Sequence, residues 1–442
     1  MHLAPHTPGV RVAVHPTAPS VAEPGERPEQ ARTLKVLVLG QLLSGAGLAA
    51  GLTVGVLIAD EMLGGAGLAG VSMALFILGA AGASAMVGGV SQRRGRRVGL
   101  ALGYLLGAVG AFGVVVAAGT DSIALLLVSF VVYGAGSAAN LQARYAGADL
   151  ATPATRGRAV STVLVATTLG AVAGPNLVTP TGAVARAMGL PELAGPFLLA
   201  GVAYGAAGLV LLALLRPDPL LLARRLAHQT SAAATDTGSS PDAAEPVRRD
   251  VLLAGVALMT VTQVVMIAIM TVTPLHMRGH GHSLGAAGLV IAVHVGAMYL
   301  PAPLAGWLLD RFGAALVTGA AAGTLLAAGV VAALAPVHSV PVLALALGLL
   351  GVGWSLGLVG GTAMVASALP VATRARTQGV VDLLIALAGA GSGLGAGFVV
   401  AGAGFTPLAL GGGLLALLLV PVVVVTAKTG TTRTGTTRTG AA

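Results

Sequence analysis

Two apolar stretches of the chain carry methionine and histidine at a spacing that could bind a soft metal ion. Met266 and Met270 are four residues apart, as are His294 and Met298, and residues four apart lie on one face of a helix. Thioether sulfur and neutral imidazole suit Cu(I), and they hold a monovalent ion without adding a buried negative charge. The pattern therefore predicts a ligand ladder, although methionine is also a common packing residue. Just beyond the ladder, an outer vestibule is predicted at His276, Met277, His280 and His282.

Asp382 is the second candidate for chemistry. The chain has 15 acidic residues, and Asp382 is the only one predicted to lie well inside an apolar stretch. An ionisable group inside an apolar, membrane-spanning stretch is costly, so it is a functional candidate by default. A carboxyl group there could carry a proton across the membrane. The alternative is a structural hydrogen bond between helices, with Gln378 one turn away as its partner.

The composition requires a membrane around these residues. Apolar residues make up 56% of the chain and charged residues 9%, with a mean hydropathy of +0.92, whereas soluble domains carry about 25% charged residues. A membrane span needs about 20 mostly apolar residues. We predict an all-α protein with twelve spans, near 36–59, 67–90, 98–118, 122–144, 157–178, 195–215, 251–274, 284–306, 314–335, 340–366, 376–400 and 406–427.

The order of the spans divides the chain into tails, halves and a central loop. Residues 1–34 and 428–442 are predicted to be disordered tails, and 216–250 a polar loop between six-helix halves at 35–215 and 251–427. Lysine and arginine collect in the tails and in alternate loops, and such residues stay on the cytoplasmic side. We therefore expect a multi-pass protein of the cytoplasmic membrane, with both termini and the central loop inside the cell.

The two halves repeat one motif at an offset of 218 residues. The first copy is Gly88, Gln92, Arg93, Gly95 and Arg96, and the second is Gly306, Asp310, Arg311 and Gly313. Halves that repeat in the same orientation are typical of parallel repeats around an axis normal to the membrane. The motif resembles the gate signature of the major facilitator superfamily. The resemblance implies that the glycines let helices approach closely and that an acid pairs across the interface. In the first copy, Gln92 stands at the position of that acid.

Two further resemblances within this superfamily point to different functions. The ligand ladder is similar to that of the copper-importing CcoA-like branch, which implies that its four residues bind copper and that transport is inward. Gly174 and Pro175 in the fifth span resemble the helix kink of drug/proton antiporters. That resemblance implies proton-coupled efflux of a small organic compound, with Asp382 as the proton carrier. Copper import is the first hypothesis and proton-coupled efflux is the alternative.

The sequence also argues against several other classes of protein. The net charge is +9, but aromatic residues make up only 3% of the chain, too few to stack on single-stranded nucleic acid. The chain has no cysteine and hence no thiolate metal site. No lysine lies in a glycine-rich loop that could bind a nucleotide, and no nucleophile–base pair suggests an enzyme. We expect a monomer without cofactor, whose partners are the lipid bilayer and a transported solute, with copper as a substrate.

The predicted orientation can be checked because the chain has no cysteine of its own. Gly281→Cys should react with a membrane-impermeant thiol reagent added to intact cells, since the turn around this residue is expected outside. Ser239→Cys, in the central loop, should react only after the cells are opened. The reverse labelling pattern would invert the topology.

Overall fold

The computed structural model describes residues 28–63, 66–236 and 247–435, apart from the side chains of a few residues within these ranges. All regular elements in this part of the chain are helical, which confirms the predicted fold class. Ten described segments are long and apolar enough to cross a membrane, and the two other predicted spans, 36–59 and 157–178, are occupied by the helices α1 (Pro28–Leu63) and α5 (Arg156–Asn176). In lipid, a helix satisfies its backbone hydrogen bonds internally, so apolar stretches adopt this form.

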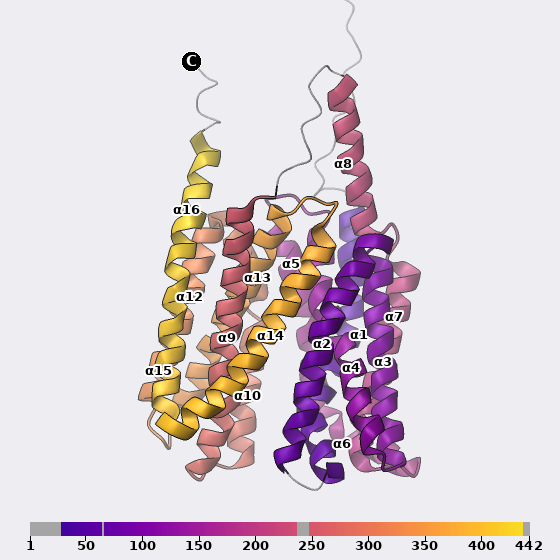
Figure 1. Cartoon of the computed structure of the whole chain (residues 1–442), viewed down its shortest axis with the longest axis vertical. Coiled ribbons are helices and arrows are strands. Elements are labelled where there is room, and N and C mark those ends of the chain that lie inside the picture. The colour runs from indigo at the N-terminus through magenta and orange to yellow at the C-terminus, as the bar shows by residue number, and fades with distance from the viewer. Residues whose placement is uncertain (1–27, 64–65, 237–246, 436–442) are drawn as a thin grey trace, which may run out of the picture.

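The helices form two halves joined by a linker helix. The first half adds α2 (Ala66–Arg94), α3 (Arg96–Gly119), α4 (Ile123–Ala148), α6 (Val178–Ala187), η2 (Glu192–Ala194) and α7 (Gly195–Leu214) to α1 and α5. The second half comprises α9 (Arg249–Gly279), α10 (Leu284–Tyr299), α11 (Ala302–Phe312), α12 (Ala314–Leu334), α13 (Val340–Ala368), α14 (Arg374–Ala403), α15 (Phe405–Leu415), η3 (Ala416–Leu419) and α16 (Val420–Gly435). The linker helix α8 (Pro219–Asp236) projects from one end of the bundle, here called the α8 end (Figure 1).

Some predicted elements differ in detail from the observed ones. The eighth span is broken, because α10 ends at Tyr299 and α11 begins at Ala302, on either side of Pro301, which cannot donate a backbone hydrogen bond. The twelfth span is divided into α15, η3 and α16. Helix α1 begins within the predicted tail 1–34, and α16 extends into the predicted tail 428–442. Residues 1–27, 237–246 and 436–442, which hold the rest of both tails and part of the central loop, lie outside the described residues.

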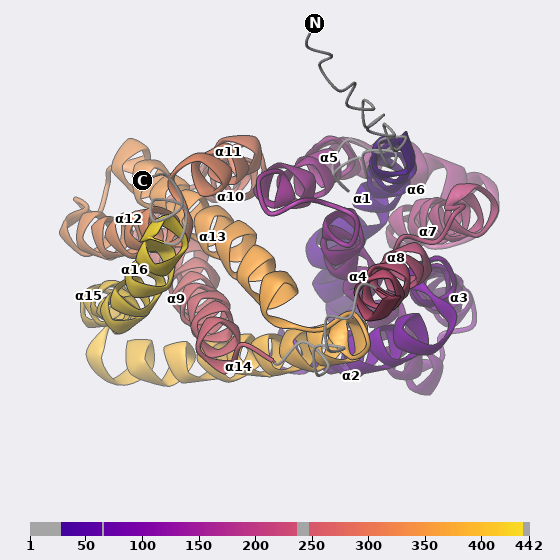
Figure 2. The same ribbon diagram turned by 90° about the horizontal axis from the view of Figure 1, so that it is seen from above.

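The halves lie side by side and meet along two pairs of helices. Viewed along the bundle, α14 runs beside α2 on one side, and α11 lies beside α5 on the other (Figure 2). From its start beside α2, α14 slants away, so that its far end lies near α15 (Figure 1). Each half has its own apolar core. The core of the second half also takes in Tyr145 and Ala148 of α4 and Val160 and Leu164 of α5.

Glycine shapes the turns that carry the repeated motif. Gly95, between α2 and α3, has φ 91°, and Gly313, between α11 and α12, has φ 84°. A residue with a β-carbon rarely adopts this backbone conformation. The repeat therefore preserves the same sharp turn at the α8 end of both halves.

Glycine also lets helices of the first half pack backbone against backbone. A β-carbon on Gly110 of α3 would lie 2.2 Å from the backbone nitrogen of Tyr133 on α4, far inside van der Waals contact. Close approach between small residues is a main source of helix association in membranes. The contact between α3 and α4 therefore depends on the absence of a side chain at this position.

We predict that Gly110→Ala lowers the thermal stability of the purified protein in detergent. The added methyl group must push α3 away from α4, and overpacking of this kind costs about 1–3 kcal/mol. Gly319→Ala on α12 is the matched control, because no atom lies within 4 Å of its β-carbon position. Equal unfolding temperatures for both variants would show that this contact does not limit stability.

Candidate functional site

A buried ion pair joins the two halves, in the part of the bundle toward the α8 end. Arg144 of α4 donates from Nη2 to Asp382 Oδ1 at 2.6 Å and from Nη1 to Oδ2 at 3.4 Å. Both side chains are at most 1% exposed. Bidentate bonds between arginine and carboxylate are among the strongest in proteins, and removing one partner leaves an uncompensated buried charge. The pair therefore ties α4 of the first half to α14 of the second.

The remaining polar atoms around the pair are also satisfied. Arg144 Nε donates to Thr362 Oγ1 at 2.8 Å, and its Nη2 donates to the Tyr145 hydroxyl at 3.2 Å. That hydroxyl in turn donates to Asp382 Oδ1 at 3.3 Å, and Arg144 Nη1 donates to the carbonyl oxygen of Leu141. A proton added to Asp382 would cancel the negative charge and leave Arg144 without its counter-ion. Protonation and contact between the halves are therefore energetically coupled at this site.

Sequence reasoning missed Arg144. Span four was predicted to end at residue 144, so the arginine was assigned to the cytoplasmic side, but α4 continues to Ala148 and buries it. The repeat held a signal, because the equivalent residue 218 positions further on is Thr362, which falls inside the predicted span 340–366. The predicted structural partner of Asp382 was wrong. Gln378 Oε1 instead accepts a bond of 2.5 Å from Arg96 Nη2.

Arg96 of the repeated motif is the centre of a second buried network, nearer the α8 end. Its Nε donates to Asp149 Oδ2 at 2.8 Å, and both side chains are at most 1% exposed. Arg374 Nη1 lies 3.9 Å from the other oxygen of Asp149. Because Gln378 and Arg374 belong to α14, this network is a second polar connection between the halves.

Asp310, the acid of the second motif copy, caps the start of α5 in the other half. Its carboxylate accepts from the backbone nitrogens of Gly157 at 2.7 Å and Arg158 at 2.9 Å. It also accepts from Arg158 Nε at 3.2 Å. A helix N-terminus carries a partial positive charge, so a carboxylate there is stabilising. We call this contact the α5 latch.

Gln92 makes the equivalent contact in the first motif copy, at the start of α14. Its Oε1 accepts from the backbone nitrogens of Ala375 at 2.7 Å and Arg376 at 3.3 Å. Its Nε2 donates to the carbonyl oxygens of Ala372 at 2.6 Å and Val371 at 3.3 Å, which a carboxylate could not do. We call this contact the α14 latch. It works through hydrogen bonds alone, without an ion pair.

The motif glycines lie beneath the two latches. A β-carbon on Gly88 would be 2.8 Å from Gly379 Cα, and one on Gly306 would be 2.5 Å from the Gly157 oxygen. The structure therefore has backbone-to-backbone contact between the halves at both copies. Arg93 and Arg311 are exposed at the α8 end. Gly174 and Pro175 belong to α5, but their side-chain surroundings lie outside the described residues.

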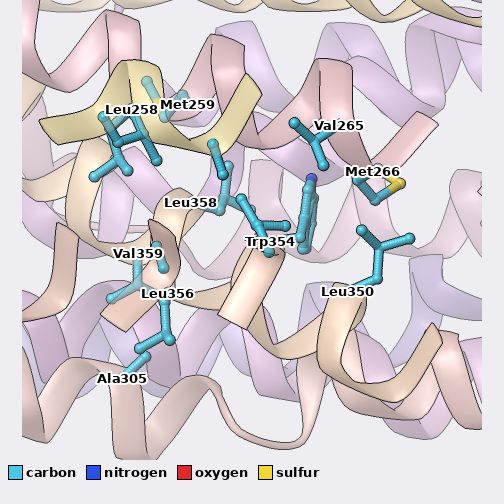
Figure 3. Close-up of a cluster of buried hydrophobic side chains, with 14 of the residues drawn as sticks. Leu258, Met259, Val265, Met266, Ala305, Leu350, Trp354, Leu356, Leu358 and Val359 are labelled. Atoms are coloured by element: carbon cyan, nitrogen blue, oxygen red, sulfur yellow. The ribbon is translucent and has the colours of Figure 1, made fainter. Parts of the chain in front are cut away.

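The predicted copper ligands are spread over two helices that both pack against α13. His294 is fully buried, and its Nδ1 lies 2.8 Å from the carbonyl oxygen of Leu347 on α13. Within the described chain, its Nε2 has no hydrogen-bonding partner. Met266 is 3% exposed in the core of the second half (Figure 3), and Met270 and Met298 are half-buried around it. Helices α9 and α10 touch one another little, so copper ligation across this hairpin stays a prediction.

The predicted outer vestibule lies at the end opposite α8. The rings of His276 and His280 are 4.4 Å apart between centroids, and His276 also stacks on Phe405 at 4.2 Å. His282 Nε2 lies 2.8 Å from the carbonyl oxygen of Val337, and Met277 is buried. Among the described residues, no three His, Cys, Asp or Glu side chains are grouped to hold a metal ion.

Comparison with known proteins gives consistent matches over most of the chain. The Major Facilitator Superfamily model matches residues 37–313. The uncharacterized MFS-type transporter YdeG of Bacillus subtilis (strain 168) is 52% identical over 393 residues, covering 89% of this chain and 91% of YdeG. The riboflavin transporter RfnT of Brucella anthropi is 32% identical, covering 80% of this chain and 85% of RfnT.

A solved structure supports the same fold. The human organic anion transporter MFSD10 (TETRAN) superposes with a TM-score of 0.71 at 20% identity, covering 90% of this chain and 100% of that protein. The names of these three proteins do not mention copper. The resemblance to the copper-importing branch therefore remains a prediction about this chain.

The ligand role of Met266 can be separated from packing by one substitution. Met266→Leu keeps volume and apolarity but deletes the sulfur, and such core exchanges usually cost less than ~1.5 kcal/mol. The ligand hypothesis predicts a folded protein that no longer accumulates radiolabelled copper in copper-limited cells. Met86→Leu on α2, which is 37% exposed, is the matched control. Copper accumulation equal to the wild type in Met266→Leu would reject the ladder.

Proposed function

Since this chain belongs to the major facilitator superfamily of membrane transporters, we propose that it moves a small organic solute across the membrane in a proton-coupled cycle. Asp382 is the proton carrier in this proposal, and Arg144 is its counter-ion. The observation that carries it is the buried pair between them, placed where the two halves meet. Its two states, paired and protonated, differ in how strongly the halves are held together.

The charge on Asp382 determines which arrangement of the halves is favoured. While ionised, the carboxylate compensates the guanidinium in a site from which water is excluded, and the halves are held together there. Once protonated, it keeps a hydrogen-bonding hydroxyl but loses the Coulomb attraction, which is strong at low dielectric. Arg144 then favours an arrangement in which water or an anionic group of the solute can reach it. Proton binding thereby promotes separation of the halves.

The nature of the solute is suggested by a relative. RfnT, at 32% identity over most of both chains, is a transporter of riboflavin, which is an organic molecule and not a metal ion. An organic solute also agrees with a central site built from arginine, aspartate, tyrosine and threonine, which are hydrogen-bonding groups. Riboflavin is therefore a suitable first solute for transport measurements on this chain.

The proposal also assigns the observed conformation. Both latches and the Arg96 network hold the halves together at the α8 end. With lysine and arginine on the cytoplasmic side, that end faces the cytoplasm in the cell membrane. The conformation is then the one closed to the cytoplasm, and the cycle requires α5 to separate from α11 and α2 from α14.

A buried cysteine reports this separation without knowledge of the solute. Ser161 of α5 is buried, and a β-carbon on Gly306 of α11 would lie 2.4 Å from its hydroxyl oxygen. Ser161→Cys should therefore react with a thiol reagent only when the α8 end opens. We predict that its labelling rate in purified protein, divided by that of the exposed Gly281→Cys at the same pH, rises as the pH falls, since the thiolate fraction affects both rates. Adding Asp382→Asn should give a high ratio at every pH, because the ion pair is permanently absent.

Two comparisons make this measurement specific. Thr318→Cys is buried inside the second half, away from the interface, and should stay unlabelled unless the protein unfolds. A pH dependence that Asp382→Asn leaves unchanged would remove Asp382 from the coupling mechanism.

A further inference from the structure

Two side chains of the second half meet around the indole ring of Trp354. Trp354 of α13 donates from Nε1 to Gln263 Oε1 of α9 at 2.8 Å. Its ring lies 5.8 Å from that of Tyr299 on α10, at an interplanar angle of 75°. Trp354 is itself 5% exposed and belongs to the core cluster shown in Figure 3. Gln263, Tyr299 and Trp354 are together called the Trp354 corner. The buried indole fixes the positions of the other two side chains.

Gln263 and Tyr299 each keep a polar group uncovered. Both side chains are only half-buried, and no residue in the described part of the chain accepts from Gln263 Nε2 or bonds the Tyr299 hydroxyl. On α14, a β-carbon on Gly389 would lie 3.2 Å from Gln263 Nε2, so a glycine leaves this amide group room. Unpaired polar groups deep in a membrane protein are costly. Two of them beside one aromatic ring indicate that a bound molecule supplies their partners.

The Trp354 corner lies close to the proposed proton site. Gly389 follows Asp382 by seven residues on α14, which places both on the same face of the helix, two turns apart. A solute bound at this corner would therefore lie on the same side of α14 as the ion pair, two turns away, where its binding and the pairing of Asp382 influence one another.

We propose that the Trp354 corner is the recognition surface for the solute, and that the solute carries a flat ring with a hydrogen-bond acceptor on its edge. The ring stacks on Tyr299, and Gln263 Nε2 donates to the edge acceptor. Trp354 is a positioning residue, because it holds the Gln263 amide by its N–H and supports Tyr299 edge to face. Aromatic stacking and one directed donor distinguish such a ring from a sugar or a metal ion. This inference rests on the proposed transport of an organic solute and specifies its class.

The test is equilibrium binding of lumichrome to the purified full-length protein in nanodiscs, measured by fluorescence anisotropy. Lumichrome is a flat fused ring system with carbonyl groups on its edge. The wild type should bind it saturably, and Tyr299→Leu should weaken binding about tenfold, as expected for loss of one stacking contact. Tyr299→Phe keeps the ring and should bind better than Tyr299→Leu. Gln263→Leu should also weaken binding about tenfold.

Further variants separate recognition from folding. Trp307→Leu, which removes an aromatic residue of the same half that is 48% exposed, should bind lumichrome like the wild type. Trp354→Phe keeps an aromatic ring but loses the N–H, and adding it to Gln263→Leu should cause little further loss, because coupled partners are not additive. Wild-type protein without saturable binding, or binding as tight as the wild type by both Tyr299→Leu and Gln263→Leu, would overturn the proposal.

Failure of this inference is distinguishable from failure of the proton-coupling proposal. Lumichrome binding is measured at equilibrium and requires no proton movement. Saturable, Tyr299-dependent binding together with pH-independent labelling of Ser161→Cys would support the corner and reject the coupling. Labelling of Ser161→Cys that depends on pH, together with no saturable binding of lumichrome, would support the coupling and reject the Trp354 corner as a site for a flat ring.

Discussion

Placing a guanidinium group inside the hydrocarbon region of a membrane is costly unless an anion and hydrogen-bond acceptors surround it. Arg144 is fully buried, and its acceptors come from Asp382, Thr362, Tyr145 and Leu141. Two of these belong to the other half of the molecule. Neither half can therefore satisfy its own buried charge, and their association here is an electrostatic requirement as well as a matter of apolar packing.

The same contact lies near the axis that relates the two halves. Arg144 and Thr362 are separated by 218 residues and hydrogen-bond to one another, and this is also the offset between the motif copies. Two residues at equivalent positions in a twofold repeat can touch only close to the repeat axis. Transporters built from such repeats rock their halves around a central site. A charge pair that joins the halves there is made and broken as they move.

The apolar stretches were enough to predict the helices, because a membrane imposes its thickness and its demand for internal backbone hydrogen bonds on every span. The break at Pro301 was not predicted, because whether a proline interrupts a helix depends on how that helix packs against its neighbours. Arg144 escaped prediction because an arginine near a predicted span end reads as an anchor on the membrane surface. Gln263 was overlooked because it carries no charge. The partners of Gln92 could not be predicted from a local pattern, because they are brought together only by the tertiary structure. Ala375, for example, is 283 residues away in the sequence. The role of the methionines remained ambiguous, because the same four-residue spacing occurs in helix packing and in metal ligation.

The two latches occupy equivalent positions but differ in charge. Asp310 holds α5 as an anion against a helix N-terminus and a partly exposed arginine, whereas Gln92 holds α14 through neutral amide bonds. The contact between Arg158 and Asp310 is 3.2 Å long, well inside the screening length of about 8 Å at physiological ionic strength, so dissolved salt weakens it little. The lasting difference lies in the donors: the carbonyl oxygens of Ala372 and Val371 accept from the Gln92 amide, which a carboxylate cannot replace. The two copies of one motif are therefore no longer interchangeable between the halves.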